Sequence, residues 1–143
     1  CREEDRVELI SIYKKIGVKF IVEKYFNNID KIFERSDLII SRSGASTVCE
    51  ISASRRPSIL IPLPNSLDNH QFENAFELTN HKASHLIEQK DFSENNLSKI
   101  LKEYILNKQI LLEMADNARL MYRGGSSEKI INLVLSTLKG NNR

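Results

Sequence analysis

A segment rich in glycine and hydroxylated residues has the composition of an anion-binding turn. Residues 41–50 read SRSGASTVCE and directly follow the apolar run Leu38-Ile39-Ile40. Where a strand ends and a helix begins, the first backbone N–H groups of the helix have no partner within it. Gly44 leaves room for a ligand at the backbone, and further donors come from Arg42, Ser43, Ser46 and Thr47. These residues predict a phosphate site, although plain strand-to-helix turns also contain this pattern.

Two further groups of polar residues are placed to extend such a site. Glu50 comes about one and a half helical turns after Gly44, where a carboxylate can accept hydrogen bonds from both hydroxyls of a ribose. Gln71 and Asn74 lie one turn apart near the start of a later predicted helix, and amides both donate to and accept from sugar hydroxyls. An exposed helix residue and an ordinary polar first turn are equally good interpretations of these positions.

The histidines and cysteines form no pattern typical of catalysis or metal binding. His70 precedes Gln71, but no further ligand stands at metal-binding spacing and no Ser-His-Asp arrangement is recognisable. Cys1 and Cys49 have neither CxxC nor Cys/His spacing, which fits a reducing compartment without a disulfide or zinc. We therefore predict no catalytic residue, metal or cofactor in this chain.

Length and charge narrow the class of protein. The 143 residues have the size of one domain, and a hydrophobic fraction of 41% is enough for a core. Because 21 basic residues stand against 19 acidic ones, a nucleic-acid partner is not expected. No apolar run approaches the roughly 20 residues of a membrane span, and no signal peptide is recognisable. The start at Cys1, without a methionine, indicates a fragment.

Short apolar runs that alternate with helical patterns predict the elements that position these residues. The predicted strands are residues 18–22, 37–41, 58–61 and 84–87. The predicted helices are residues 3–15, 29–35, 45–54, 69–80, 93–107, 108–122 and 126–139. This order is typical of the α/β class, a doubly wound parallel sheet flanked by helices, here with a helical C-terminal tail. Such sheets bind ligands beyond the carboxyl ends of their strands, where the polar segments lie.

Taken together, the polar segments resemble a known family. Residues 37–51, DLIISRSGASTVCEI, are followed by Pro57, by Ile61-Pro62, and by a third block, residues 68–75, which contains HQ and NA. This order resembles the MurG family, the bacterial N-acetylglucosaminyltransferases of glycosyltransferase family 28, with their R-S-G-A-x-T-x-x-E and H-Q-x-x-N-A elements. The resemblance implies the Rossmann-like carboxyl-terminal half of a two-domain GT-B glycosyltransferase.

The resemblance also implies a role for each candidate site residue. In that family the corresponding residues hold the donor UDP-N-acetylglucosamine without a metal ion. The diphosphate is expected at Ser43, Gly44, Ala45, Ser46 and Thr47. The ribose is expected at Glu50, the uracil against Phe26, and the sugar hydroxyls at Gln71 and Asn74 with His70 beside them. Arg42 belongs to the family pattern, and a structural role is equally open for it.

For the complete enzyme, the resemblance implies transfer of N-acetylglucosamine to lipid I with inversion at the anomeric carbon. The product, lipid II, is used in peptidoglycan synthesis, so the implied roles are cell wall biogenesis, cell shape and cell division. Residues 1–143 are expected to be the donor-binding domain without its first strand and glycine-rich loop. The amino-terminal domain, with the acceptor site, the general base and the membrane surface, is expected to be absent, so this fragment alone is expected to be inactive. The expected location is the bacterial cytoplasm, peripheral on the inner membrane. The alternatives are another GT-B nucleotide-sugar enzyme and a non-catalytic nucleotide-binding fragment.

Overall fold

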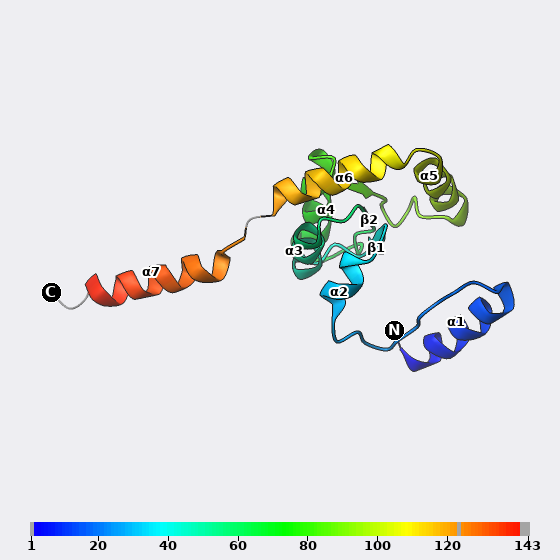
Figure 1. The fold of residues 1–143 in the computed structure, drawn as a ribbon, viewed down its shortest axis with the longest axis horizontal. Helices are drawn as coiled ribbons and strands as arrows, with labels where there is room; N and C mark the ends of the chain where they lie inside the picture. Colours follow the sequence, from blue (N-terminus) through cyan, green and yellow to red (C-terminus); the bar gives the residue numbers. More distant parts are fainter. Residues whose placement is uncertain (1, 123, 141–143) are drawn as a thin grey trace. The chain divides into compact units, whose positions relative to one another are not determined.

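The structure is a computed structural model that describes residues 2–122 and 124–140. Its elements, in chain order, are α1 (Glu3–Ile16), α2 (Ile29–Glu34), β1 (Ile39–Ser41), α3 (Ala45–Ser54), β2 (Ser58–Leu60), the 3-10 helix η1 (Leu67–Asn69), α4 (His70–Asn80), β3 (Ser84–Leu86), α5 (Glu94–Leu106), α6 (Lys108–Met121) and α7 (Ser126–Gly140) (Figure 1). The chain divides into two compact units, Cys1–Ile32 and Phe33–Arg143. Cys1, one of the two cysteines considered above, lies outside the described residues.

In the first unit, α1 ends at Gly17, directly after its last residue Ile16. Gly17 has a φ of 77°, and its N–H donates to the carbonyl groups of Tyr13 and Lys14. A left-handed residue at this position favours glycine because a Cβ atom would crowd the neighbouring carbonyl. Beyond the turn, the ring of Phe20 lies 5.4 Å from that of Tyr13, centroid to centroid.

The strand predicted at residues 18–22 is absent from the described structure, so this prediction is wrong. Residues 18–22 are not assigned to any helix or strand. A β-strand requires a neighbouring strand that completes its hydrogen bonds, and a β-branched composition does not supply one. Here the carbonyl oxygen of Val22 instead accepts a hydrogen bond from Nε of Arg6 at 3.1 Å. This segment is therefore held by contacts with side chains of α1, and not by hydrogen bonds to a neighbouring strand.

The second unit is built on a parallel sheet with the strand order β1-β2-β3. Ile39 lies opposite Ser58, and Ser58 in turn lies opposite Ser84, so the strands begin at the same level. Each crossover contains a helix, α3 between β1 and β2 and α4 between β2 and β3 (Figure 1). The predicted α/β class with a parallel sheet is therefore confirmed.

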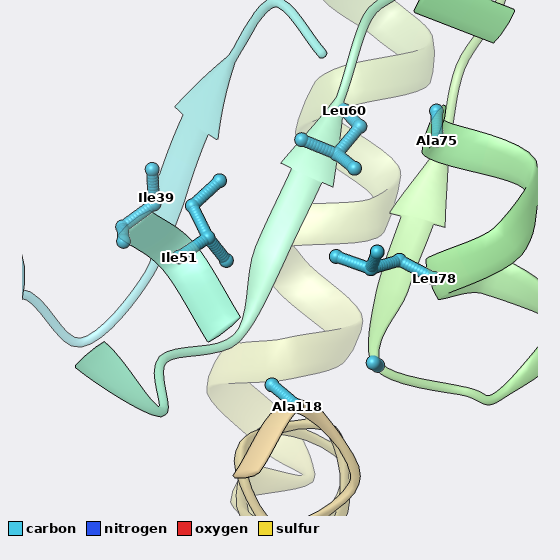
Figure 2. Close-up of a cluster of buried hydrophobic side chains, with 7 residues drawn as sticks. Ile39, Ile51, Leu60, Ala75, Leu78 and Ala118 are labelled. Carbon is cyan, nitrogen blue, oxygen red and sulfur yellow. The ribbon is translucent and has the colours of Figure 1, made fainter. Parts of the chain in front are cut away.

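Both faces of the sheet are covered by helices. Leu60 of β2 packs in one cluster with residues of β1, α3, α4 and α6, and Figure 2 shows these side chains converging between the elements. Its neighbours Ile59 and Ile61 belong to a second cluster with residues of α5 and α6. Successive side chains of a strand point to opposite faces, so a continuous apolar run is required where both faces are buried.

The helices of the second unit follow the predicted bounds closely. α3 has the predicted range of residues 45–54, and α5, α6 and α7 each differ from prediction by at most one residue at either end. Pro57 follows α3 and precedes β2, where a proline cannot continue a helix. At the start of α5, the hydroxyl of Ser93 accepts a hydrogen bond from the N–H of Asn96 at 3.2 Å. In the described part of the chain, no helix is long and apolar enough to span a membrane.

Candidate functional site

The turn between β1 and α3 presents an open helix N-terminus at the carboxyl end of the sheet. Gly44 is the N-cap residue with extended backbone, and its carbonyl accepts from the N–H of Val48 at 3.0 Å. No side chain caps this end, and the first turn of α3 carries no acidic residue. By helix geometry, the N–H groups of Ala45, Ser46 and Thr47 therefore have no acceptor within the helix. Together with the helix dipole, they favour a bound anion.

Gly44 is not required by the fold. Its φ of −61° is open to any residue. A Cβ atom built on Gly44 would meet no other atom nearer than Oγ1 of Thr47, at 4.0 Å. Apart from its chain neighbours, no atom of the described residues closes the space beside Gly44, as a site that brings a ligand close to the backbone requires.

Ser43 differs from the other hydroxyl residues of this turn because it is fully buried. Its Oγ donates to the carbonyl of Gln71 at 2.7 Å. Its own carbonyl accepts from Nδ2 of Asn74 at 3.0 Å. In contrast, Ser46 is exposed and Thr47 is half-buried. The structure thus directs the Ser43 hydroxyl toward α4, while that of Ser46 is accessible to solvent.

Arg42 connects the same turn to the loop that follows β2. Its Nη1 donates to the carbonyl groups of Ile61 and Pro62, both at 3.1 Å. The side chain is a structural tie and at the same time places a permanent positive charge at the carboxyl ends of β1 and β2. A cavity of about 310 Å³ adjoins this charge and is lined by Ile40, Ser41, Arg42, Ile61, Gln89 and Phe92.

The first turn of α4 is held against the loop after β2. Oε1 of Gln71 accepts from the N–H of Leu63 at 3.0 Å, and the N–H of Gln71 donates to Oγ of Ser66 at 3.3 Å. Just before the helix, Asp68 and Asn69 both have left-handed backbone, with φ values of 48° and 55°. Asp and Asn tolerate this conformation better than most residues, and together they turn the chain sharply into α4.

The remaining candidates have different surroundings. His70 is exposed, and its Nδ1 lies against the carbonyl of Leu67. Glu50 is exposed on the second turn of α3. Phe26 belongs to the first unit, in the segment that precedes α2, so its expected contact with a base stays a prediction. The structure therefore brings together the β1–α3 turn and the first turn of α4, within the second unit.

Sequence reasoning missed the connections between these segments. It did not predict that Leu63 and Ser66 bind Gln71, or that Asn74 binds the backbone of Ser43. Leu63 and Ser66 lie within 8 residues of Gln71, whereas Asn74 and Ser43 are 31 residues apart, and no local pattern signals any of these bonds. The only available signal was the density of turn residues in the loop after β2.

Other features of the second unit do not coincide with the predicted residues. A cavity of about 600 Å³ lies against α3 and α4 and is lined by Val48, Cys49, Ser52, Glu77, Leu78, Met121, Tyr122, Gly124, Gly125 and Glu128. It contains none of the candidate ligand residues, and it opens on a helical face and not at the strand ends where α/β sheets bind ligands. Among the described residues, no three histidine, cysteine or acidic side chains lie close enough to hold a metal ion.

Comparison with known proteins gives a consistent set of similarities. A sequence model described as "Glycosyltransferase family 28 C-terminal domain" matches residues 1–133. A UDP-N-acetylglucosamine--N-acetylmuramyl-(pentapeptide) pyrophosphoryl-undecaprenol N-acetylglucosamine transferase from Zymomonas mobilis is 36% identical over 134 residues, which are 94% of this chain and 35% of that protein. The transferase of the same name from Rickettsia akari is 37% identical over 80% of this chain and 30% of its own length.

Among solved structures, the crystal structure of Acinetobacter baumannii MurG superposes with a TM-score of 0.85 and 25% sequence identity. The superposition covers 95% of this chain and 40% of that one. The present chain thus spans about a third of the length of the curated relatives that it matches, for example 35% of the Zymomonas protein.

Proposed function

This chain belongs to the family of glycosyltransferase family 28 C-terminal domains, and from that membership we propose that residues 1–143 bind the nucleotide-sugar donor UDP-N-acetylglucosamine. One observation carries the proposal. The open N-terminus of α3 beside Gly44 is tied to the start of α4 by two hydrogen bonds, one to the backbone carbonyl of Gln71 and one from the side-chain amide of Asn74. This arrangement offers a diphosphate and a sugar adjacent sites at the carboxyl end of one sheet.

The diphosphate is proposed to lie on the first turn of α3. The N–H groups of Ala45, Ser46 and Thr47 donate to its oxygens, and the absence of a side chain at Gly44 admits it to the backbone. The hydroxyl of Ser46 and the charge of Arg42 add to the positive potential. When the sugar leaves, negative charge grows on the diphosphate, and these fixed dipoles stabilise it without having to reorganise.

The other parts of the donor are assigned to side chains around this turn. Gln71 and Asn74 contact hydroxyls of the sugar, with His70 beside them. Glu50 accepts from the two ribose hydroxyls, as a carboxylate with two oxygens is able to do. Phe26 is proposed to lie against the uracil. The amides of Gln71 and Asn74 are already held by the protein on one side, which reduces the entropy lost on binding.

For the whole protein, we propose the reaction that the relatives' names describe. N-acetylglucosamine passes from UDP-N-acetylglucosamine to lipid I with inversion at the anomeric carbon, which gives lipid II and UDP for peptidoglycan synthesis. The acceptor site and the general base are proposed to belong to the part of the relatives that this chain does not match. A peripheral position at the cytoplasmic face of the bacterial inner membrane accompanies this reaction.

Calorimetric titration of the 143-residue chain tests donor binding. UDP-N-acetylglucosamine is compared with UDP-N-acetylgalactosamine, which differs only in the configuration of one sugar hydroxyl. Because amides at fixed positions read hydroxyl geometry, the first compound is expected to bind at least about threefold more tightly. Equal affinity for the two would favour a nucleotide-binding module that ignores the sugar, and failure of both to bind would contradict the proposed function.

A further inference from the structure

Three hydrogen bonds link Ser43, Gln71 and Asn74 to one another and to the loop after β2. The Ser43 hydroxyl donates to the Gln71 carbonyl at 2.7 Å, and Nδ2 of Asn74 donates to the Ser43 carbonyl at 3.0 Å. The N–H of Leu63 donates to Oε1 of Gln71, also at 3.0 Å. Ser43 is fully buried, so its hydroxyl is directed into the protein and its single proton is already donated.

These bonds determine which atom each amide offers to a ligand. A carboxamide has one acceptor end and one donor end, and its orientation is assigned from its hydrogen bonds. Nδ2 of Asn74 is engaged with a carbonyl, so Oδ1 is the end that remains to accept. Oε1 of Gln71 is engaged with an N–H, so Nε2 is the end that remains to donate. The start of α4 therefore presents one donor and one acceptor in fixed places.

We propose that Ser43 is a positioning residue for the sugar half of the donor and not a ligand of the diphosphate. This inference rests on the proposed function, since it assumes that the sugar lies against Gln71 and Asn74. Ser43 holds the first turn of α4 against the β1–α3 turn, which orients Asn74 to accept from a sugar hydroxyl and Gln71 to donate to a sugar oxygen. The diphosphate is bound by the backbone N–H groups beyond Gly44, which the Ser43 hydroxyl does not touch.

The Ser43→Ala variant separates these roles. Calorimetry measures its affinity for UDP and for UDP-N-acetylglucosamine, each relative to the unaltered chain. The inference predicts that the affinity for UDP-N-acetylglucosamine falls roughly three- to tenfold, as the loss of one orienting hydrogen bond implies, while the affinity for UDP changes less than about twofold. Equal losses for both ligands would overturn the inference, because they are the signature of a contact with the diphosphate. A general loss of stability does not produce a difference between the two ligands.

Two further variants complete the test. Ser46→Ala is the matched control: it removes an exposed hydroxyl from the same turn and is expected to weaken both ligands alike. In the Asn74→Ala background, Ser43→Ala is expected to cause a smaller additional loss for UDP-N-acetylglucosamine than in the unaltered chain, since Ser43 acts in part through Asn74. Fully additive losses would contradict the inference.

Thermal unfolding confirms that each variant is folded before binding is measured. Should Ser43→Ala not unfold cooperatively, Ser43→Cys replaces it, because a thiol is a weaker donor of similar size, and the same selective loss for the sugar nucleotide is expected. If the unaltered chain binds neither ligand, the proposed function itself is contradicted. If the unaltered chain binds both ligands and the Ser43 variant weakens both equally, the proposed function stands and only the inference about Ser43 fails.

Discussion

At the scale of single residues, the turn after β1 assigns different tasks to neighbouring residues of similar chemistry. Ser43 is buried and bonded to α4, whereas Ser46 is exposed at the helix N-terminus. Arg42 holds the loop after β2 through two carbonyl groups. Gly44 is the residue for which the fold itself supplies no requirement, since its φ is open to other residues and an added Cβ atom would meet only Oγ1 of Thr47, at 4.0 Å, apart from its chain neighbours. The proposed diphosphate would supply a reason for glycine at this position.

The Gly44→Val substitution tests this interpretation. The added side chain occupies the space in which the diphosphate is proposed to approach the N–H groups of α3. We expect the affinity for UDP to fall at least about tenfold, while the free energy of unfolding changes by no more than about 1 kcal/mol, the usual scale of an N-cap effect. Calorimetry and urea unfolding measure the two quantities. Unchanged affinity for UDP in a folded variant would show that the ligand does not approach this glycine.

At the scale of elements, α3 carries the candidate site at its N-terminus, and the residue that ends it at the C-terminus has an unfavourable backbone conformation. Arg55 follows the last residue of α3 with φ 56° and ψ 47°, in the left-handed region. For a residue with a Cβ atom this conformation is unfavourable, and glycine is the usual choice. The Arg55 side chain is exposed, so the cost of arginine at this position lies in its backbone conformation.

Arg55→Gly is therefore expected to stabilise the protein. Removing the Cβ atom relieves the left-handed strain, and the greater freedom of glycine in the unfolded chain offsets part of the gain, so the net increase is about 0.5–1 kcal/mol. Arg55→Ala is the matched control, because it removes the charge and keeps the Cβ atom. Urea unfolding at neutral pH measures both variants. Equal stability of the two would rule out backbone strain as the cause.

A second element-scale feature joins β3 to α5 on the other face of the sheet. Nδ1 of His85 lies 2.8 Å from the hydroxyl of Tyr104. Burial lowers the pKa of His85 from its ordinary value of 6.5, and the nearby Glu103 carboxylate opposes this only in part. Burial, and then the same carboxylate, raise the pKa of Tyr104 to about 12. Near neutral pH, both groups are therefore held in their neutral forms.

This pair predicts a loss of stability in mild acid. Because the pKa of His85 is lower in the folded than in the unfolded protein, the unfolded chain binds more protons as the pH falls below 6.5. The contribution of His85 to stability is thus complete above that pH and declines below it. Urea unfolding at about pH 7.5 and about pH 5.5 measures the change, with His85→Gln as the variant in which the difference between the two pH values becomes smaller. An unchanged difference in that variant would contradict the assignment to His85.

At the scale of the whole molecule, local patterns predicted most of the second unit. The continuous apolar runs, the helical spacing and Pro57 were enough for the α/β class and for the bounds of α3. Local patterns failed at residues 18–22, where a strand was expected and none is present. A strand depends on a neighbouring strand, and its own composition does not reveal whether one is there.

The same distinction applies to the candidate site. The open helix N-terminus follows from the order strand, glycine, helix, which is local. The inward direction of the Ser43 hydroxyl depends on Gln71, 28 residues later, and the amide orientation of Asn74 depends on the backbone of Ser43, 31 residues earlier. Such distant pairs are visible only once the chain is folded, so the sequence could propose the residues of a site but not the hydrogen bonds that join them.

The central claim is that a nucleotide sugar binds at the carboxyl end of the sheet, on the N-terminus of α3. The most direct test is titration of the isotopically labelled chain with UDP-N-acetylglucosamine, followed through its backbone amide resonances by NMR. The account predicts that the largest shifts are those of Ala45, Ser46 and Thr47, with smaller ones at Gln71 and Asn74. Shifts concentrated instead around the cavity at Val48, Leu78 and Met121, with the amides of the β1–α3 turn unmoved, would contradict it.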